Sequence, residues 1–176
     1  MKRPLPADLV AARQRTLEDV IAPDLRILFV GINPGLWSGA LGFHFAKPGN
    51  RFWKAIHLAG LTPTLLTPDH QRDLLRYGIG LTNVVNRTTA VASELTADEL
   101  RLGATVLQAK IRQFKPAKVA FLGLSAYRVA FGQPKAVVGR QELSVGGSEA
   151  WVMPNPSGLN AHYQLADLAA VYSALK

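Results

Sequence analysis

The sequence predicts an α/β protein, a three-layer α/β/α sandwich with a mainly parallel central sheet. Short apolar runs, typical of buried strands, alternate along the chain with segments that carry helix-start and helix-stop signals. The chain has 176 residues, a length that favours one domain with a single core. We therefore expect residues 16–176 to form one domain, preceded by a loosely held arm at residues 1–15.

The first half of the chain is predicted to contribute two strands with a long irregular segment between them. Gly60 and Gly78 follow apolar segments of helical length and indicate where two helices end. Pro23 stops a short helix soon after its start. The expected elements are a helix from Thr16, a strand at 26–30, a glycine- and proline-rich loop at 31–50, helices at 51–59 and 69–77, and a strand at 79–85.

The second half is predicted to add further strands and three helices. Thr96 and Glu99 form a capping box, and the helix that they open should run to about Phe114 because Pro116 follows. The remaining expected elements are a strand at 118–122, a helix capped by Ser125 and reaching Phe131, a hairpin of 142–145 and 149–153 around Gly146 and Gly147, and a closing helix at 164–175 with Leu165, Leu168, Ala169 and Tyr172 on one face.

The composition excludes several kinds of site. The chain has no cysteine, which excludes disulfides, thiolate zinc sites and cysteine-held iron–sulfur clusters. Its four histidines lack metal-ligand spacing, so we expect no metal and no cofactor. A formal charge of +8 favours a polyanionic partner, and nucleic acid is the commonest polyanion.

The N-terminal residues and the hydropathy pattern bear on location. Pro4, Pro6 and Asp8 interrupt the apolar core that a signal peptide needs. No stretch is long and apolar enough to span a membrane. We expect a cytoplasmic, nucleoid-associated protein that acts as a monomer.

Segments rich in glycine, asparagine, serine and threonine follow the predicted core strands. They are residues 31–35, 86–89, 123–125 and 154–158. The carboxyl ends of parallel strands meet at one edge of the sheet, where ligands of such folds bind. These segments therefore predict a site whose wall suits hydrogen bonding and close backbone approach.

Three side chains near these strand ends each allow a functional and a structural interpretation. Asn33 could bind a water or a substrate group, or it could cap its own tight turn. Phe45 could stack on a base, or it could pack beneath its own loop. Leu159 could be a wedge that enters a base stack, or a core leucine at the start of the last helix. The residues alone leave these alternatives open.

Familiar hydrolytic motifs are missing from the sequence. No carboxylate lies inside the strand-end segments, so no paired-carboxylate site is visible. Ser125 and Ser157 lack the Gly-x-Ser-x-Gly frame of acyl-transfer enzymes. Residues 31–35 lack the lysine and the spacing of a phosphate loop. Glu94, in the polar loop before the helix opened by Thr96, is kept as a candidate general base.

Several motifs resemble those of one protein family. They are Gly31–Leu36, Gly42–Phe45, Asn50–Lys54, Gly80–Asn83, Arg87–Thr89 and Asn155–Leu159. From about Glu18 to the C-terminus, and in consistent order, they are similar to motifs of mismatch-specific uracil-DNA glycosylases and thymine-DNA glycosylases. The resemblance implies a uracil-DNA glycosylase-like α/β/α fold and a monofunctional enzyme. Such an enzyme flips uracil, and in some members thymine or a modified base, mispaired with guanine, out of double-stranded DNA.

The resemblance also implies roles for individual residues. Asn33 matches the asparagine that positions the attacking water, and Phe45 matches the aromatic residue that stacks on the flipped base. The Ile32 backbone and the Asn83 side chain match contacts to that base. The loop that enters the duplex and meets the widowed guanine corresponds to Asn155, Gly158 and Leu159, with Ser157 and Asn160 as further candidate DNA contacts.

The match departs from the family at a few positions. Ala161 stands where some bacterial members carry an arginine, and Leu124 stands where a lysine reaches the backbone in some members. Trp37 replaces a smaller residue, and His44 is closer to the thymine-DNA pattern than to the bacterial one. These departures leave the breadth of substrates open.

Two other functions stay open beside the glycosylase. The first is a non-catalytic binder of mismatched DNA, which has no need of a water-positioning amide such as Asn33. The second is a small nucleoside or nucleotide hydrolase, which has no need of a wedge such as Leu159 because a free nucleoside leaves no gap to fill.

Overall fold

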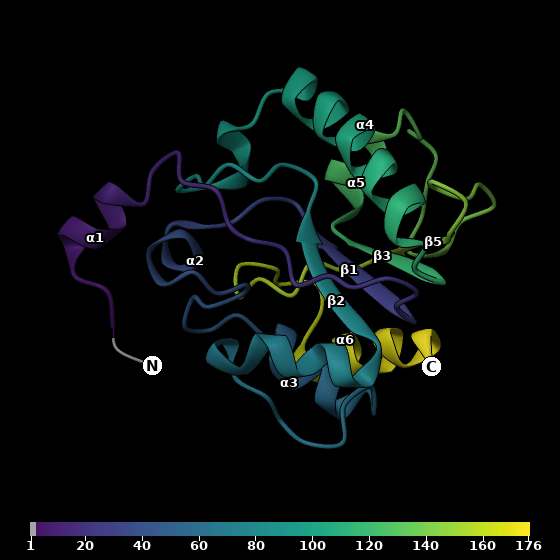
Figure 1. The fold of residues 1–176 in the computed structure, drawn as a ribbon, viewed down its shortest axis with the longest axis horizontal. Coiled ribbons are helices and arrows are strands. Elements are labelled where there is room, and N and C mark those ends of the chain that lie inside the picture. The colour runs from purple at the N-terminus through teal and green to yellow at the C-terminus, as the bar shows by residue number, and fades with distance from the viewer. Residues whose placement is uncertain (1–2) are drawn as a thin grey trace.

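The computed structural model describes residues 3–176, and its centre is a five-stranded sheet (Figure 1). The strand order is β2–β1–β3–β5–β4. The strands are β1 (Ile27–Gly31), β2 (Ile79–Asn83), β3 (Lys118–Leu122), β4 (Gly139–Arg140) and β5 (Glu149–Met153). Every pairing is parallel except that of the short β4 with β5. The carboxyl ends of β1, β2, β3 and β5 therefore lie along one edge of the sheet.

Helices cover both faces of the sheet, and β1 shows how the sequence specifies this. Ile27 and Phe29 belong to one buried cluster, and Leu28 and Val30 belong to the other. The alternation of strand side chains thus serves two cores at once. One layer contains α3 (Phe52–Leu58), α6 (Leu165–Tyr172) and the 3-10 helix η1 (Pro68–Tyr77). The other layer contains α4 (Ala97–Phe114) and α5 (Leu124–Ala130) (Figure 1). An α-helix was expected where η1 lies. The predicted three-layer α/β/α fold is confirmed.

Local signals set the ends of α4 as expected. The Glu99 N–H donates to Thr96 Oγ1 at 3.1 Å, and the Thr96 N–H donates to Glu99 Oε2 at 2.9 Å. This is the reciprocal pair of a capping box. The helix ends where Lys115 takes a left-handed conformation, with φ of 50°, just before Pro116. The closing helix is also present, as α6 followed by the 3-10 turn η3 (Ser173–Leu175).

The prediction of a helix that begins at Thr16 is wrong. The segment instead runs antiparallel beside β2 and the residues that follow it: Val20 pairs with Leu81 of β2, and Thr16 pairs with Arg87 beyond the strand, each as an isolated bridge. The sheet edge offers unpaired backbone groups, and Pro23 leaves too short a segment for a stable helix. Pairing with the edge therefore wins over helix formation.

The 31–50 segment is not a continuous loop, because it contains α2 (Leu36–Leu41). Its glycines argue against a helix, yet one of them has a packing role. A Cβ on Gly39 would lie 2.6 Å from Thr88 Oγ1, so this glycine permits close contact between α2 and the segment after β2. Gly42, with φ of 75°, then ends the helix.

Two expectations for the second half need correction. The helix α5 begins two residues earlier than a helix capped by Ser125 would, so Ser125 lies inside it and Gly123 takes the capping position. Residues 142–145 do not form a strand, and β4 lies earlier in the chain. The turn itself is present, since Val145 pairs with Ser148 around two glycines in left-handed conformations.

Part of the predicted N-terminal arm is attached to the domain. Residues Pro6–Ala11 form a short helix, α1, and Ala12 behind it is fully buried. The Gln14 N–H donates to the Thr88 carbonyl at 3.3 Å. How loosely the arm is held stays a prediction. Within residues 3–176, no helix combines the length and the apolar character needed to cross a membrane.

Candidate active site

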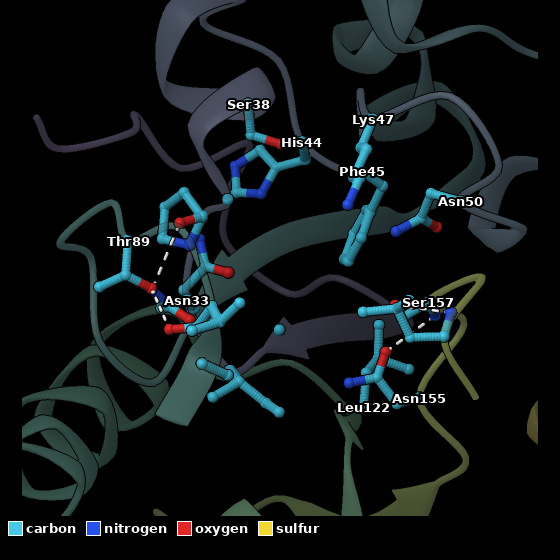
Figure 2. Close-up of a pocket in the computed structure, with 18 of the residues that line it drawn as sticks. Asn33, Ser38, His44, Phe45, Lys47, Asn50, Thr89, Leu122, Asn155 and Ser157 are labelled. Carbon is cyan, nitrogen blue, oxygen red and sulfur yellow. Dashed lines mark hydrogen bonds between the residues drawn. The ribbon is translucent and has the colours of Figure 1, made fainter. Parts of the chain in front are cut away.

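A cavity of about 420 Å³ opens where β1, β2, β3 and β5 end (Figure 2). Ligand pockets commonly measure about 300–1,000 Å³, so this cavity can hold a small planar ring system. The predicted site residues that line it are Ile32, Asn33, Phe45, Asn83, Asn155, Ser157, Leu159 and Asn160. The strand-end segments thus meet around one cavity, as the topology leads us to expect.

Asn33, on the turn after β1, has its amide fixed by three hydrogen bonds. Its Nδ2 donates to Thr89 Oγ1 at 2.7 Å, to the Arg87 carbonyl at 3.0 Å and to the Pro34 carbonyl at 3.3 Å. Carbonyl oxygens only accept, and the Thr89 hydroxyl already donates to the Val91 carbonyl at 2.8 Å, so these bonds require the amide nitrogen at this position. Oδ1 has no partner among the described residues and remains available as an acceptor at the cavity wall.

Phe45 provides a flat apolar surface inside the cavity (Figure 2). Its ring stacks on Phe52 with centroids 4.1 Å apart and planes inclined by 24°, and Phe52 meets Phe29 edge-on at 5.2 Å. Its φ of 53° is uncommon for an aromatic residue and needs support from its surroundings. One side of the ring rests on the core, and the ring lines the cavity, so a planar base could stack on it.

His44 holds the backbone that precedes Phe45. Its Nε2 lies 2.9 Å from the Glu18 carbonyl, which can only accept, so Nε2 carries the proton. Burial lowers the pKa of the imidazole below its usual 6.5, and the ring is neutral near pH 7. The His44 N–H donates to Gln71 Oε1 at 2.8 Å, and the His44 carbonyl accepts from Trp53 Nε1 at 3.3 Å. These bonds stabilise the left-handed conformation of Phe45 without adding a charge to the cavity.

Asn83, the last residue of β2, brings a second amide to the cavity. Its side chain is 6% exposed, and its Nδ2 is buried without a hydrogen-bond partner among the described residues. A Cβ on Gly31 would lie 2.5 Å from Asn83 Oδ1, so the glycine leaves room for this amide. A buried unpaired amide favours a ligand with a complementary donor and acceptor. The adjacent C=O and N–H groups of a pyrimidine base have that pattern.

The loop after β5 forms part of the cavity rim and carries Leu159. Asn155 Oδ1 accepts from the Ser157 N–H at 2.9 Å, which closes the turn. Leu159 is 81% exposed, so its interpretation as a core leucine is wrong. Gly158 is not among the residues that line the cavity. A Cβ at that position would lie 2.9 Å from the Gly49 carbonyl oxygen, so this glycine lets two loops touch.

Glu94 is likewise not among the residues that line the cavity. Its Oε1 accepts from the N–H groups of Ala90 and Val91 at 3.1 and 3.2 Å, and its Oε2 lies 3.6 Å from Arg13. Glu94 therefore closes its own turn. The structure does not bring it together with Asn33, and its proposed role as a general base has no support from this geometry.

The charges around the cavity are few. The described residues that line it include no aspartate or glutamate, and Lys47 lies at its edge beside Phe45 (Figure 2). Across residues 3–176, no three or more histidine, cysteine, aspartate or glutamate side chains cluster as a metal site would require. Amides, hydroxyls and backbone groups, rather than a carboxylate, surround the space where a ligand would bind.

Some cavity residues were not predicted from the sequence. Ser38, Lys47 and Asn50 line the cavity, and Thr89 supports Asn33. Thr89 lies in a strand-end segment, so the topology was a usable signal for it. The other three reach the cavity because α2 and the following turns fold over the strand ends, which no local pattern indicates.

The fold and the cavity together define a class of protein. It is an α/β protein whose parallel strands end at a cavity lined by two amides and an aromatic face, an arrangement that suits a planar ring. The sequence profile of the uracil DNA glycosylase superfamily matches residues 18–176. The chain therefore belongs to the uracil DNA glycosylase superfamily, whose members are DNA repair hydrolases that act on N-glycosyl bonds.

The fold is also similar to a solved structure. This is the solution NMR structure of a candidate uracil DNA glycosylase from Methanosarcina acetivorans. The two chains share 21% sequence identity, and the match covers 92% of this chain and 98% of the other with a TM-score of 0.61. At that identity the similarity concerns the fold alone.

Proposed function

We propose that the protein excises uracil mispaired with guanine from double-stranded DNA, with thymine and modified bases as further candidate substrates. One observation carries this proposal: a cavity large enough to hold a base has an exposed apolar side chain, Leu159, at its rim. A base cannot be attacked while it is stacked in a duplex, so an enzyme that acts on it must extrude it and fill the gap. The cavity would receive the base, and Leu159 would fill the gap.

The walls of the cavity supply contacts for a pyrimidine. The base would stack on Phe45, which is already supported by Phe52. The unpaired amide of Asn83 would bond to the edge of the base, and the Ile32 backbone lies in the same wall. A mispaired base costs less to extrude than a paired one, which provides selectivity before these contacts form.

Asn33 would orient the water that completes hydrolysis. The base leaves with the electrons of the N-glycosyl bond, and the sugar carbon becomes oxocarbenium-like. Water then adds to this carbon and loses a proton to the departing base or to solvent. An amide does not titrate near neutral pH, so Asn33 Oδ1 can accept a hydrogen bond from this water and position it, but cannot remove its proton.

The alternatives find less support in the site. If the protein were a nucleoside hydrolase, a leucine that is 81% exposed beside the cavity would have no role. If the protein only bound DNA, it would not need the three bonds that orient the Asn33 amide.

The proposal is tested with labelled duplexes that contain uracil or thymine opposite guanine, or uracil opposite adenine, followed by alkaline cleavage. We expect cleavage at the uracil opposite guanine, with Asn33→Ala as the inactive control. The positive charge should also make duplex binding weaken with salt, with a log–log slope of about −0.9 per phosphate contacted. Binding without cleavage would favour the non-catalytic binder, and cleavage of free deoxyuridine alone would favour the nucleoside hydrolase.

A further inference from the structure

Arg51, the residue before α3, directs its side chain away from its own helix and toward the loop after β5. Its guanidinium donates to four backbone carbonyl oxygens of that loop. These carbonyls belong to Pro156, Ser157, Asn160 and Tyr163. The Arg51 backbone N–H adds a further bond, to the Pro156 carbonyl at 3.0 Å. Five hydrogen bonds thus run from one residue to one loop.

The chemistry of the guanidinium suits this task. It has five N–H donors in a rigid plane and no acceptor, and four carbonyls can be bonded only when they converge on that plane. Nη2 alone bonds to Ser157 and to Asn160, the latter at 2.9 Å. The donors of Arg51 are therefore turned into the protein, so this arginine is not arranged to bind a phosphate.

The loop that Arg51 holds is the one that carries Leu159. Bonds within the loop set its local shape: Asn160 Nδ2 donates to the Asn155 carbonyl at 2.9 Å, and the Asn160 N–H donates to the Ser157 carbonyl at 3.0 Å. These bonds do not attach the loop to the rest of the domain. Arg51 does, through Ser157 and Asn160 on either side of the exposed leucine and through Pro156 and Tyr163 farther along the loop.

We propose that Arg51 is a positioning residue for the extrusion of the base. It holds the loop so that Leu159 already stands at the cavity rim before DNA binds. Ordering the loop would otherwise cost free energy during binding, and a preorganised loop avoids that cost. This inference rests on the proposed function, because it concerns how the same site engages a duplex.

The chain offers a matched control in Arg128 of α5. Arg128 is also half-buried, and its Nε and Nη2 donate to the Ala136 carbonyl at 2.9 and 2.6 Å. It therefore binds a loop in the same way, but that loop does not line the cavity. Arg128→Met loses the bonds of a half-buried arginine to a single loop carbonyl without touching the Leu159 loop.

The experiment compares Arg51→Met, Arg51→Lys and Arg128→Met in single-turnover excision from a G·U duplex and from single-stranded DNA. A misplaced Leu159 side chain should serve no worse than a truncated one, so we expect Arg51→Met to lose duplex activity by up to about tenfold, the loss expected for Leu159→Ala. Its activity on single-stranded DNA should fall far less, because no gap has to be filled there. Arg128→Met should keep the wild-type ratio of the two activities.

Arg51→Lys keeps the charge and guards against a misfolded Arg51→Met. An ammonium has three donors and lacks the planar fork of the guanidinium, so it cannot bond to all four carbonyls, and this variant should also show a lowered ratio of duplex to single-strand activity. A wild-type ratio in Arg51→Lys would overturn the inference, because charge alone would then suffice.

A double variant shows whether Arg51 acts through Leu159. In a Leu159→Ala variant, the further substitution Arg51→Met should lower duplex activity little more, because the effects of substitutions at residues that act as one unit are not additive. Full additivity, or equal losses on both substrates, would make Arg51 an ordinary structural residue.

Hydrogen exchange separates this inference from the proposed function. The Ser157 and Asn160 amides should exchange faster in Arg51→Met than in wild type or in Arg128→Met. If the wild-type protein excises no base from any duplex, the proposed function fails. Unchanged exchange in Arg51→Met would independently refute the role of Arg51 in holding the loop.

Discussion

Asn33 and Leu159 line the same cavity but are held in different ways. Asn33 follows directly from a central strand, and its amide bonds to the neighbouring strand-end segment. Leu159 stands on a loop that leaves the sheet, and the side chain of Arg51 attaches that loop to the domain. Under the proposed function, the chemistry would depend on the sheet, whereas engagement of the duplex would depend on the Arg51 side chain, which can be changed separately.

The largest expected effect comes from Asn33→Ala. Loss of the oriented acceptor should lower the excision rate at least about 100-fold, because a poorly placed water reacts slowly. Binding of mismatched DNA should remain largely intact, since the loop that carries Leu159 is unchanged. Single-turnover rates and a binding titration measure the two quantities. Turnover near the wild-type rate would show that Asn33 does not position the water.

A smaller effect is expected from Leu159→Ala, on the order of tenfold in duplex activity and less on single-stranded DNA. Its thermal unfolding should barely change, because substitutions of exposed residues usually shift stability by no more than about 0.5 kcal/mol. A large drop in melting temperature, or equal loss on both substrates, would contradict the wedge. In that case Leu159 would have no role in engaging the duplex that is separate from the chemistry at Asn33.

The free energy of unfolding should decrease at acid pH because of His44, whose backbone precedes Phe45. The folded state lowers the pKa of this imidazole below its usual 6.5, so the unfolded chain takes up the proton first as the pH falls. The stabilising contribution is complete above about pH 6.5 and is lost as the pH falls from there toward the lowered pKa. Urea unfolding of wild type and His44→Gln should therefore show a smaller acid loss in the variant. Parallel pH profiles would contradict this account.

The smallest effect is expected from Glu94→Gln. Its carboxylate closes a turn beside the cavity and pairs weakly with Arg13, so excision should stay close to the wild-type rate. The pH–rate profile between about pH 6 and 8 should remain flat in both proteins, because no carboxylate lines the cavity. An inactive Glu94→Gln with an active Asn33→Ala would reverse the assignment of the catalytic residue.

The sequence predicted the central sheet because the period and boundaries of its strands are local. Thr96, Glu99 and the glycines that end helices act within a few residues, and their signals agree with the fold. The segment at Thr16 failed because its pairing partner, β2, lies far away in the chain. Local propensity cannot report a free sheet edge that only the fold creates.

The candidate site divides in the same way. Asn33, which lies just after β1, was predictable because parallel strands bring their ends together. Asn83 was predicted only by the family resemblance, because the expected strand at 79–85 extended past it, whereas it is the last residue of β2. The partners that decide what those residues do, such as Thr89 for Asn33 and Arg51 for the Leu159 loop, required coordinates. Hydrogen bonds between distant segments leave no periodic trace in the sequence.

The segment beside β2 covers a sheet edge that would otherwise be open to a second molecule. β2 ends the sheet, and an uncovered terminal strand would offer its backbone groups to a second molecule. Val20 and Leu81 exchange hydrogen bonds of 2.9 and 2.7 Å across this edge, so those groups are already satisfied. A chain shortened to begin after Val20 should therefore form oligomers at concentrations where the full chain does not, which light scattering would reveal.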